Sequence, residues 1–155
     1  MRRGFTLIEL MIAVVLTGLL VNGALVAYRG LGERQKVKQA GMSFQTDLKS
    51  YQQKAAAGEK PAVCTDTDRL IGYRVKRINT VSYSVTADCE VADPLGVTVN
   101  LPAGVNFKVG VSFDLFFPVL SGAVTGATTI TLENGAYSYL VTIESSGVIR
   151  GEVGQ

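Results

Sequence analysis

The feature that most constrains this chain is an apolar stretch near its N-terminus. From Leu10 to Tyr28 the sequence runs for nineteen residues without a charged side chain, and only Thr17 and Asn22 are polar. As a helix, residues 5–28 would span about 36 Å, whereas the hydrocarbon core of a bilayer is about 30 Å thick. The sequence therefore predicts a helix that can cross a membrane.

One charge, Glu9, lies inside this apolar segment, and its chemistry has two explanations. Thr6-Leu7-Ile8-Glu9 fits the S/T-x-x-E capping box, and a carboxylate there also faces the positive end of the helix dipole. Alternatively, a carboxylate at membrane depth costs about 2.5–3.5 kcal/mol and should find a cationic partner in a neighbouring molecule. Helix chemistry alone leaves both explanations open.

The residues around Glu9 form a dense and contiguous motif, in which two arginines and a glycine precede Phe-Thr-Leu-Ile-Glu-Leu. This run resembles the leader of type IV prepilins and of type II secretion pseudopilins. The resemblance implies that a prepilin peptidase cuts after Gly4 and that the new amine of Phe5 is N-methylated. It also implies that Glu9 pairs with the Phe5 amine of an adjacent subunit during filament assembly.

The leader also sets the expected location and partners. Cleavage after four residues leaves the apolar anchor in place, unlike cleavage of a secretory signal peptide. Basic residues flank both ends of the apolar stretch, so charge counting does not fix the orientation. The resemblance implies a single-pass inner-membrane protein with a cytoplasmic N-terminus, which later enters a periplasmic pseudopilus or a surface pilus. Its expected partners are other pilin or pseudopilin subunits, prepilin peptidase, the inner-membrane assembly platform and, before assembly, membrane lipid.

Beyond the anchor, 155 residues leave room for one domain. We expect a prepilin leader at residues 1–4, a transmembrane and filament-core helix at 5–28, an amphipathic helix at 29–58 and an antiparallel β head at 59–155. Residues 29–58 hold six basic and two acidic side chains, whereas residues 59–155 hold seven basic and ten acidic ones. A basic helix therefore carries a mildly acidic head.

Apolar residues recur at spacings of three and four along the second helical segment. These residues are Val37, Ala40, Phe44, Leu48, Tyr51 and Ala55. They predict one face of a helix that packs on the head. The side chains expected well away from that face are Lys38, Gln45, Lys49 and Gln52. The sequence predicts one long helix from Thr6 to about Ala57, ended by Gly58 and Pro61.

After Pro61 the hydrophobic period changes from 3.6 to 2, which predicts strands. The expected strands cover residues 71–76, 81–86, 97–101, 105–113, 130–132, 137–143 and 148–151. Ile71, Tyr73 and Val75 should share one face, Asn134-Gly135 should turn a hairpin, and residues 118–126 should form a mobile loop. The predicted fold is α+β, a long N-terminal helix packed on an antiparallel β-sheet head, as in pilins.

The head resembles those of the H-type minor pseudopilins and the FimT-like minor pilins. The likeness is carried by short segments at residues 101–105, 111–113, 137–143 and 146–150. Together with the leader it touches about half of the chain, and it implies a minor subunit.

The two cysteines, Cys64 and Cys89, are a candidate disulfide. A closed loop of about 25 residues stabilises a fold by about 3–4 kcal/mol in the loop-entropy account. The pair is consistent with an oxidising compartment, and two unpaired buried thiols are the alternative. A zinc site is not expected, because the chain has no histidine and no Cys-x-x-Cys.

The absence of histidine also removes Ser-His-Asp and Cys-His machinery, and no phosphate-binding or dinucleotide motif occurs. We therefore expect neither an enzyme nor a cofactor. Asp66 and Asp68 offer oxygen ligands for calcium, but two carboxylates fall short of the usual six to eight ligands. Solvated turn residues are the favoured interpretation of this pair.

Nucleic-acid binding is the alternative function. Some FimT-like minor pilins are thought to bind DNA through a C-terminal Gly-Arg-x-Arg motif, and Gly147-Val148-Ile149-Arg150 keeps its glycine and last arginine. Arg74 and Lys76 share a strand face and Arg77 follows, which makes a small basic patch. An acidic head with few clustered cations should bind phosphates weakly, so a filament subunit is favoured. A third hypothesis is a tethered domain that keeps its leader and never polymerises.

Overall fold

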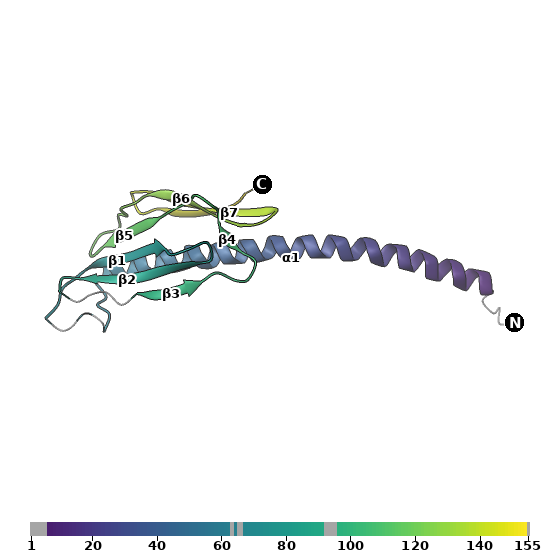
Figure 1. Ribbon diagram of the computed structural model, residues 1–155, viewed down its shortest axis with the longest axis horizontal. Helices are drawn as coiled ribbons and strands as arrows, with labels where there is room; N and C mark the ends of the chain where they lie inside the picture. The colour runs from purple at the N-terminus through teal and green to yellow at the C-terminus, as the bar shows by residue number, and fades with distance from the viewer. Residues whose placement is uncertain (1–5, 63, 65–66, 92–95, 155) are drawn as a thin grey trace.

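A long helix and two small β-sheets make up the fold of the residues that the structure describes. The structure is a computed structural model that describes residues 6–62, 64, 67–91 and 96–154, apart from the side chains of residues 20–29. Helix α1 (Leu7–Ala57) runs from the N-terminal end into the head, and the sheets pack only along its outer half (Figure 1). Gly4, Phe5 and Asp66 lie outside the described residues.

Both ends of α1 are set by the residues that the sequence indicates. Thr6 is the N-cap, with an extended backbone at φ −81° and ψ 151°. Gly58 ends the helix in the left-handed region at φ 65°, where its N–H donates to the Ala55 carbonyl at 3.0 Å. Because glycine has no Cβ, it adopts this conformation at little cost. The predicted helix limits are confirmed.

Eight strands lie within the described residues of the head. They are β1 (Leu70–Arg77), β2 (Ser82–Cys89), β3 (Val97–Asn100), β4 (Asn106–Phe107), β5 (Asp114–Pro118), β6 (Thr128–Asn134), β7 (Tyr137–Ile143) and β8 (Ile149–Gly154). They form two four-stranded sheets with the orders β3-β2-β1-β5 and β4-β6-β7-β8, in which neighbouring strands are antiparallel. The α+β class and the antiparallel sheets are as predicted.

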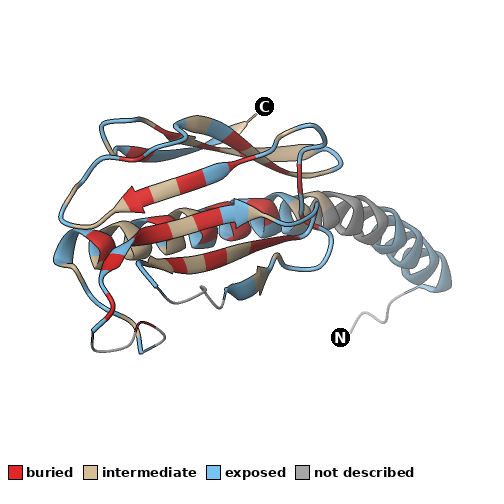
Figure 2. Cartoon of the chain, turned by 60° about the vertical axis from the view of Figure 1, so that its left-hand side comes forward, coloured by how far each residue is buried: buried red, intermediate tan, exposed pale blue. Residues whose placement is uncertain are grey.

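The core lies where both sheets meet the apolar stripe of α1 (Figure 2). Phe44 is at its centre, with ring centroids 5.0 Å from Tyr83, 5.5 Å from Phe107 and 5.7 Å from Phe113. Edge-to-face and tilted contacts of this kind suit the quadrupoles of aromatic rings. One helical residue therefore joins strands of both sheets.

The polar flank of α1 differs from the prediction at two positions. Lys38 and Lys49 are exposed as expected, but Gln45 and Gln52 are half-buried. Gln45 donates from Nε2 to the Ile149 carbonyl at 3.2 Å, and Gln52 donates to the Gly122 and Gly147 carbonyls, each at 2.8 Å. The head reaches round the flank of the helix, where these two amides donate to backbone carbonyls of β8 and of two loops.

The predicted strand at residues 105–113 is wrong. Only Asn106–Phe107 forms a strand there, and Gly110 turns the chain at φ 86°. Val109 is 81% exposed, whereas Phe113 is buried at the entry to β5 in the other sheet. Alternating apolar residues thus continue across a change of sheet, which the sequence period does not reveal.

Strand β1 begins with an irregularity that changes the facing of Ile71. The register with β2 shifts between Leu70 and Gly72. A β-bulge moves one residue out of the alternation. Ile71 is therefore 48% exposed, whereas Tyr73 and Val75 are buried, so the prediction that all three share a face is wrong at Ile71.

The β6–β7 hairpin is confirmed, although its turn lies one residue later than the Asn-Gly signal suggests. Asn134 pairs with Tyr137, so the two central residues are Gly135 and Ala136. Gly135 has φ 58°, which fits a turn with glycine at its first central position. Asn134 is consequently the last residue of β6, and its side chain is available for a contact outside the turn.

Candidate processing and assembly segment

The N-terminal turn of α1 has the geometry of a helix cap. Thr6 accepts a hydrogen bond at Oγ1 from the Glu9 backbone N–H at 3.4 Å, and its carbonyl accepts from Leu10 N–H at 3.2 Å. The cap engages the backbone N–H of Glu9, and the Glu9 side chain is exposed. Capping by Thr6 and a role of the Glu9 carboxylate in assembly are therefore compatible. Cleavage after Gly4, methylation of Phe5 and the Phe5–Glu9 contact stay predictions, because Gly4 and Phe5 lie outside the described residues.

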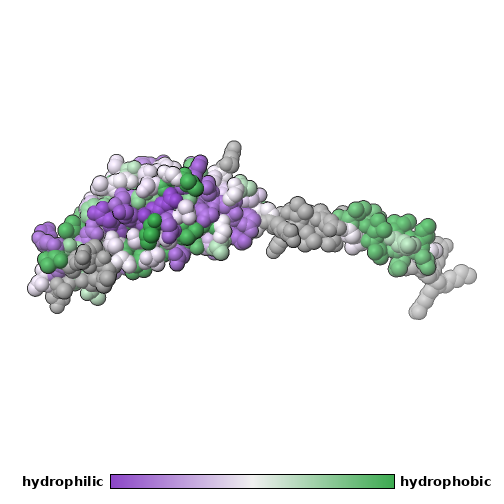
Figure 3. Space-filling model, in the orientation of Figure 1, coloured by the Kyte–Doolittle hydropathy of each residue, from purple (hydrophilic) through white to green (hydrophobic). Residues whose placement is uncertain are grey.

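The first part of α1 presents apolar side chains to the outside all round. Nine large apolar residues between Leu7 and Leu19 are each 54–78% exposed. Figure 3 shows a hydrophobic surface on the visible face of this part of the helix, and we call the nine residues the apolar sleeve. Soluble monomers rarely expose a contiguous surface of this kind, so another apolar phase or another helix is needed to cover it.

The hydroxyl of Thr17, within this sleeve, is satisfied by the helix itself. The Thr17 hydroxyl donates to the Ala13 carbonyl at 2.7 Å, a bond that removes the cost of an unpaired donor in an apolar environment. Within the described residues, no helix contains a stretch both long and apolar enough to cross a membrane.

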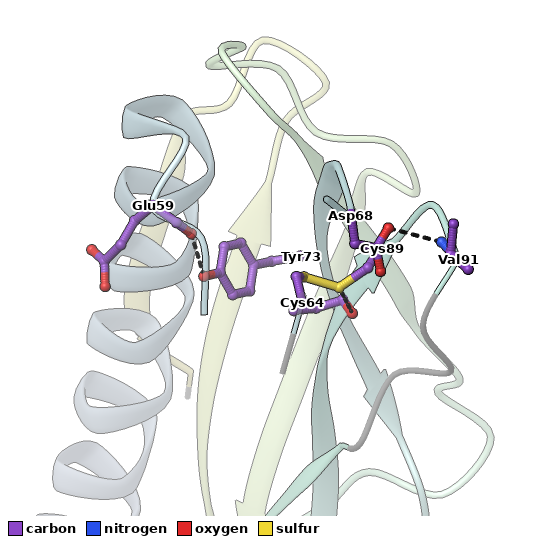
Figure 4. The surroundings of a disulfide bond; sticks show 7 residues. Glu59, Cys64, Asp68, Tyr73, Cys89 and Val91 are labelled. Atoms are coloured by element: carbon purple, nitrogen blue, oxygen red, sulfur yellow. Dashed lines mark hydrogen bonds between the residues drawn. A yellow bond between two sulfur atoms is a disulfide. The ribbon is translucent and has the colours of Figure 1, made fainter. Parts of the chain in front are cut away.

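The predicted disulfide between Cys64 and Cys89 is present, with its Cα atoms 5.8 Å apart (Figure 4). It joins the segment after α1 to the end of β2. Beside it, the Tyr73 hydroxyl donates to the Glu59 carbonyl at 2.8 Å and ties the same segment to β1. The outer end of α1 is therefore fixed to the first sheet by a covalent bond and a hydrogen bond.

Asp68 differs from the solvated turn residue that the sequence favours. It is 4% exposed, and its Oδ1 accepts from the Val91 backbone N–H at 2.9 Å. The carboxylate thus orders the two loops next to the disulfide. Among the described residues, no group of three cysteine, aspartate or glutamate side chains is placed to hold a metal ion.

Arg74, named from the sequence as a possible DNA contact, is engaged within the head. Its Nε and one terminal nitrogen donate to Asp88 Oδ2 at 3.0 and 2.9 Å, and the other donates to Asp114 Oδ1 at 3.1 Å. These bonds, above all the one to Asp88, raise the pKa of the guanidinium further. Asp88 on β2 and Asp114 on β5, the two strands that flank β1, thus balance this one cation.

Of the other three predicted cations, Arg77 and Arg150 are engaged by groups other than Arg74's carboxylates, and Lys76 lies two residues after Arg74 on β1. Arg77 donates to the carbonyls of Asn79 and Lys108 at 2.9 and 3.2 Å, and also to that of Val111. Arg150 is 3.7 Å from Glu144 on the other sheet, and Lys76 is exposed. Arg77 thus pins two loops together.

Sequence reasoning missed a polar contact at the point where α1 leaves the head. Glu33 accepts from Lys36 Nζ at 2.8 Å and from Asn134 Nδ2. The bond from Lys36, followed by the one from Asn134, lowers the pKa of the Glu33 carboxyl. The i,i+3 spacing of Glu33 and Lys36 signals their pairing, but only the fold brings Asn134 to the same carboxylate.

Comparison with known proteins identifies the N-terminal segment. Residues 1–24 match the family model described as the prokaryotic N-terminal methylation motif, which is the type IV prepilin signature. The motif implies membrane anchoring through the N-terminus, processing by prepilin peptidase and assembly with other pilin subunits, and its family is structural rather than enzymatic. No curated protein matches the chain, and no solved structure matches it either.

Proposed function

We propose that this chain, which carries the type IV prepilin signature at residues 1–24, is a structural subunit of a type IV pilus or a type II secretion pseudopilus. The signature is the observation that carries the proposal. The likeness of the head motifs to minor pseudopilins and minor pilins supports a minor position in the filament.

In this proposal the N-terminal segment has two successive environments. Before assembly, residues 5–28 lie in the inner membrane with the N-terminus in the cytoplasm. After cleavage between Gly4 and Phe5, the segment packs against the helices of other subunits in the filament core. The exposed apolar sleeve of α1 supports both states, because lipid and neighbouring helices each cover such a surface.

Glu9 acts in the second environment. Its carboxylate pairs with the methylated Phe5 amine of the adjacent subunit, which offsets the cost of a charge within an apolar bundle. The cap formed by Thr6 holds the backbone of Glu9 and does not use the carboxylate, which supports this role.

The mature N-terminus tests the proposal directly. Mass spectrometry of the protein isolated from its cells should find a chain that begins at Phe5 with one added methyl group. A chain that still begins at Met1 in functioning cells would contradict the proposal and leave a tethered β domain.

Glu9→Ala separates insertion from assembly. We expect the variant to be cleaved and to fractionate with membranes, but to be lost from sheared filament fractions, because the Phe5 amine has no partner. Glu152→Ala, which removes an exposed carboxylate from β8, is the matched control and should assemble normally. Normal incorporation of the Glu9 variant would contradict the assigned role.

A further inference from the structure

The β6–β7 hairpin contacts α1 where the helix leaves the head. Asn134 Nδ2 donates to Glu33 Oε2, and Glu33 Oε1 accepts from Lys36 Nζ at 2.8 Å. A Cβ placed on Gly30 would come within 3.3 Å of the Tyr137 hydroxyl, so the hairpin also packs closely on the helix there. We call the bond between Asn134 and Glu33 the hairpin latch.

The latch residue Asn134 is followed by glycine, and this dipeptide has a characteristic reaction. The Gly135 backbone nitrogen attacks Asn134 Cγ, and a new C–N bond closes a succinimide ring. The side-chain amide leaves as ammonia and takes the proton that Gly135 loses. Water then opens the ring to give aspartate or isoaspartate. The reaction is a substitution followed by hydrolysis, so no oxidant or reductant takes part.

The turn leaves room for the attack. Gly135 is exposed and carries no side chain, and a Cβ built on it would meet no atom within 4 Å. The surroundings of Gly135 are therefore open on the side where a side chain would stand.

We propose that Asn134 is a site of spontaneous deamidation, and that its conversion to aspartate or isoaspartate opens the hairpin latch. The reaction replaces the amide donor with a carboxylate that faces the carboxylate of Glu33. Two carboxylates at hydrogen-bond distance repel each other, so the tip of the hairpin separates from the helix. Because ammonia is lost, the latch does not re-form.

The closed latch itself delays the reaction. The bond to Glu33 restricts the rotation of the Asn134 side chain, and attack by the Gly135 nitrogen depends on that rotation. Deamidation therefore follows opening of the latch, and removal of Glu33 should accelerate it.

The chain carries its own control for the chemical step. Asn22-Gly23 is the same dipeptide, but it lies within α1, where the helical backbone holds the glycine nitrogen in place. The full chain in detergent is incubated at about pH 6 and about pH 8 and digested, and the peptides are analysed by mass spectrometry.

We expect an amide-to-acid mass change that accumulates at Asn134 several-fold faster than at Asn22. The rate should rise at the higher pH, because the attacking nitrogen must lose its proton, and it should rise several-fold again in Glu33→Ala. A rate at Asn134 no greater than that at Asn22 in both chains would overturn the proposed modification.

The structural consequence is tested separately with Asn134→Asp, which makes the product directly. Hydrogen exchange at residues 30–36 and 134–137 should be several-fold faster in Asn134→Asp than in the unmodified chain. Asn134→Ala, which removes the bond without adding a charge, should lie between them. The double variant Asn134→Asp with Glu33→Gln should return toward the original rate, because the glutamine amide donates to the new carboxylate.

Exchange in β1 and β2 reports on global folding and should be the same in all variants. Equal exchange in Asn134→Asp and Asn134→Ala, with no recovery in the double variant, would overturn the opening of the latch by charge repulsion.

Discussion

At the scale of single residues, one hydrogen bond shows how a polar group enters the core. Tyr83 is 2% exposed and packs its ring against Phe44. Its hydroxyl donates to Asp47 Oδ2 at 2.6 Å, so the chain gains aromatic burial without leaving the phenol unsatisfied. Burial, followed by the bond to Asp47, raises the pKa of Tyr83 above its ordinary value.

Because the folded-state pKa of Tyr83 lies above its unfolded value, the contribution to stability is complete below about pH 10 and is lost as the pH rises further. Tyr83→Phe should remove the part of the alkaline fall in the free energy of unfolding that is due to this phenol. Asp47→Asn should make that fall smaller without removing it. Near neutral pH, Tyr83→Phe should lower that free energy by about 1.5–3 kcal/mol, the range for a hydrogen bond to a charged group. Urea unfolding of the full chain in detergent between about pH 7 and pH 11 measures both effects. An unchanged alkaline slope in Tyr83→Phe would contradict the assignment.

At the scale of elements, the contact between α1 and the second sheet depends on two glycines. A Cβ on Gly41 would come within 2.1 Å of Tyr139 Cδ1, and one on Gly151 within 2.3 Å of the Tyr139 hydroxyl. The ring of Tyr139 is 5% exposed and fills the space between the helix and β8. Because Gly41 and Gly151 have no Cβ, the Tyr139 ring fits between the helix and β8.

Gly41→Ala should destabilise the head, although alanine is about 1 kcal/mol better than glycine within a helix. The added methyl group overlaps the Tyr139 ring, and overpacking of this kind costs about 1–3 kcal/mol. Gly32→Ala is the matched control, because a Cβ there meets nothing within 4 Å, and it should stabilise the chain. Thermal unfolding followed by near-ultraviolet circular dichroism distinguishes them. Equal melting temperatures would show that the ring moves aside freely.

At the scale of the whole molecule, the distribution of charge argues against the head as a DNA-binding surface. The head has more acidic than basic side chains, and Arg74 is bound to both Asp88 and Asp114. A cation already balanced by carboxylates contributes little to phosphate binding, which depends on the number of cations that release counterions.

Arg74→Ala should therefore leave any retardation of duplex DNA by the full chain unchanged, with the same dependence on salt. Its expected effect is a loss of about 1 kcal/mol in the free energy of unfolding, because Asp88 and Asp114 lose their partner. Lys38→Ala, on the exposed face of α1, is the comparison for a solvated cation. Weaker retardation and a smaller salt slope in Arg74→Ala would favour the nucleic-acid alternative.

Local signals in the sequence determined the N-terminal motif, both ends of α1 and the apolar face of its outer half. Each of these depends on neighbours within one or two helical turns: the leader is contiguous, Thr6 and Gly58 cap by local geometry, and the stripe from Val37 to Ala55 follows the helical period. The existence of the β6–β7 hairpin belongs with them, although its turn lies one residue later than the Asn-Gly signal suggests. Because the sequence contains two cysteines, it allows a single disulfide pairing, between Cys64 and Cys89.

Tertiary structure alone decided which polar side chains face the head and where the strands change sheet. Gln45 and Gln52 occupy helical positions that the period assigns to solvent. Their hydrogen bonds nevertheless go to backbone carbonyls that are 104 and 70 residues away in sequence, respectively. The period of two persists from Val105 to Phe113 although Phe107 is buried in one sheet, Val109 is exposed in the turn and Phe113 is buried at the entry to the other sheet. The contact between Asn134 and Glu33 also depends on the tertiary structure. The partner of a long-range contact is set by the packing of whole elements, which local periodicity does not encode.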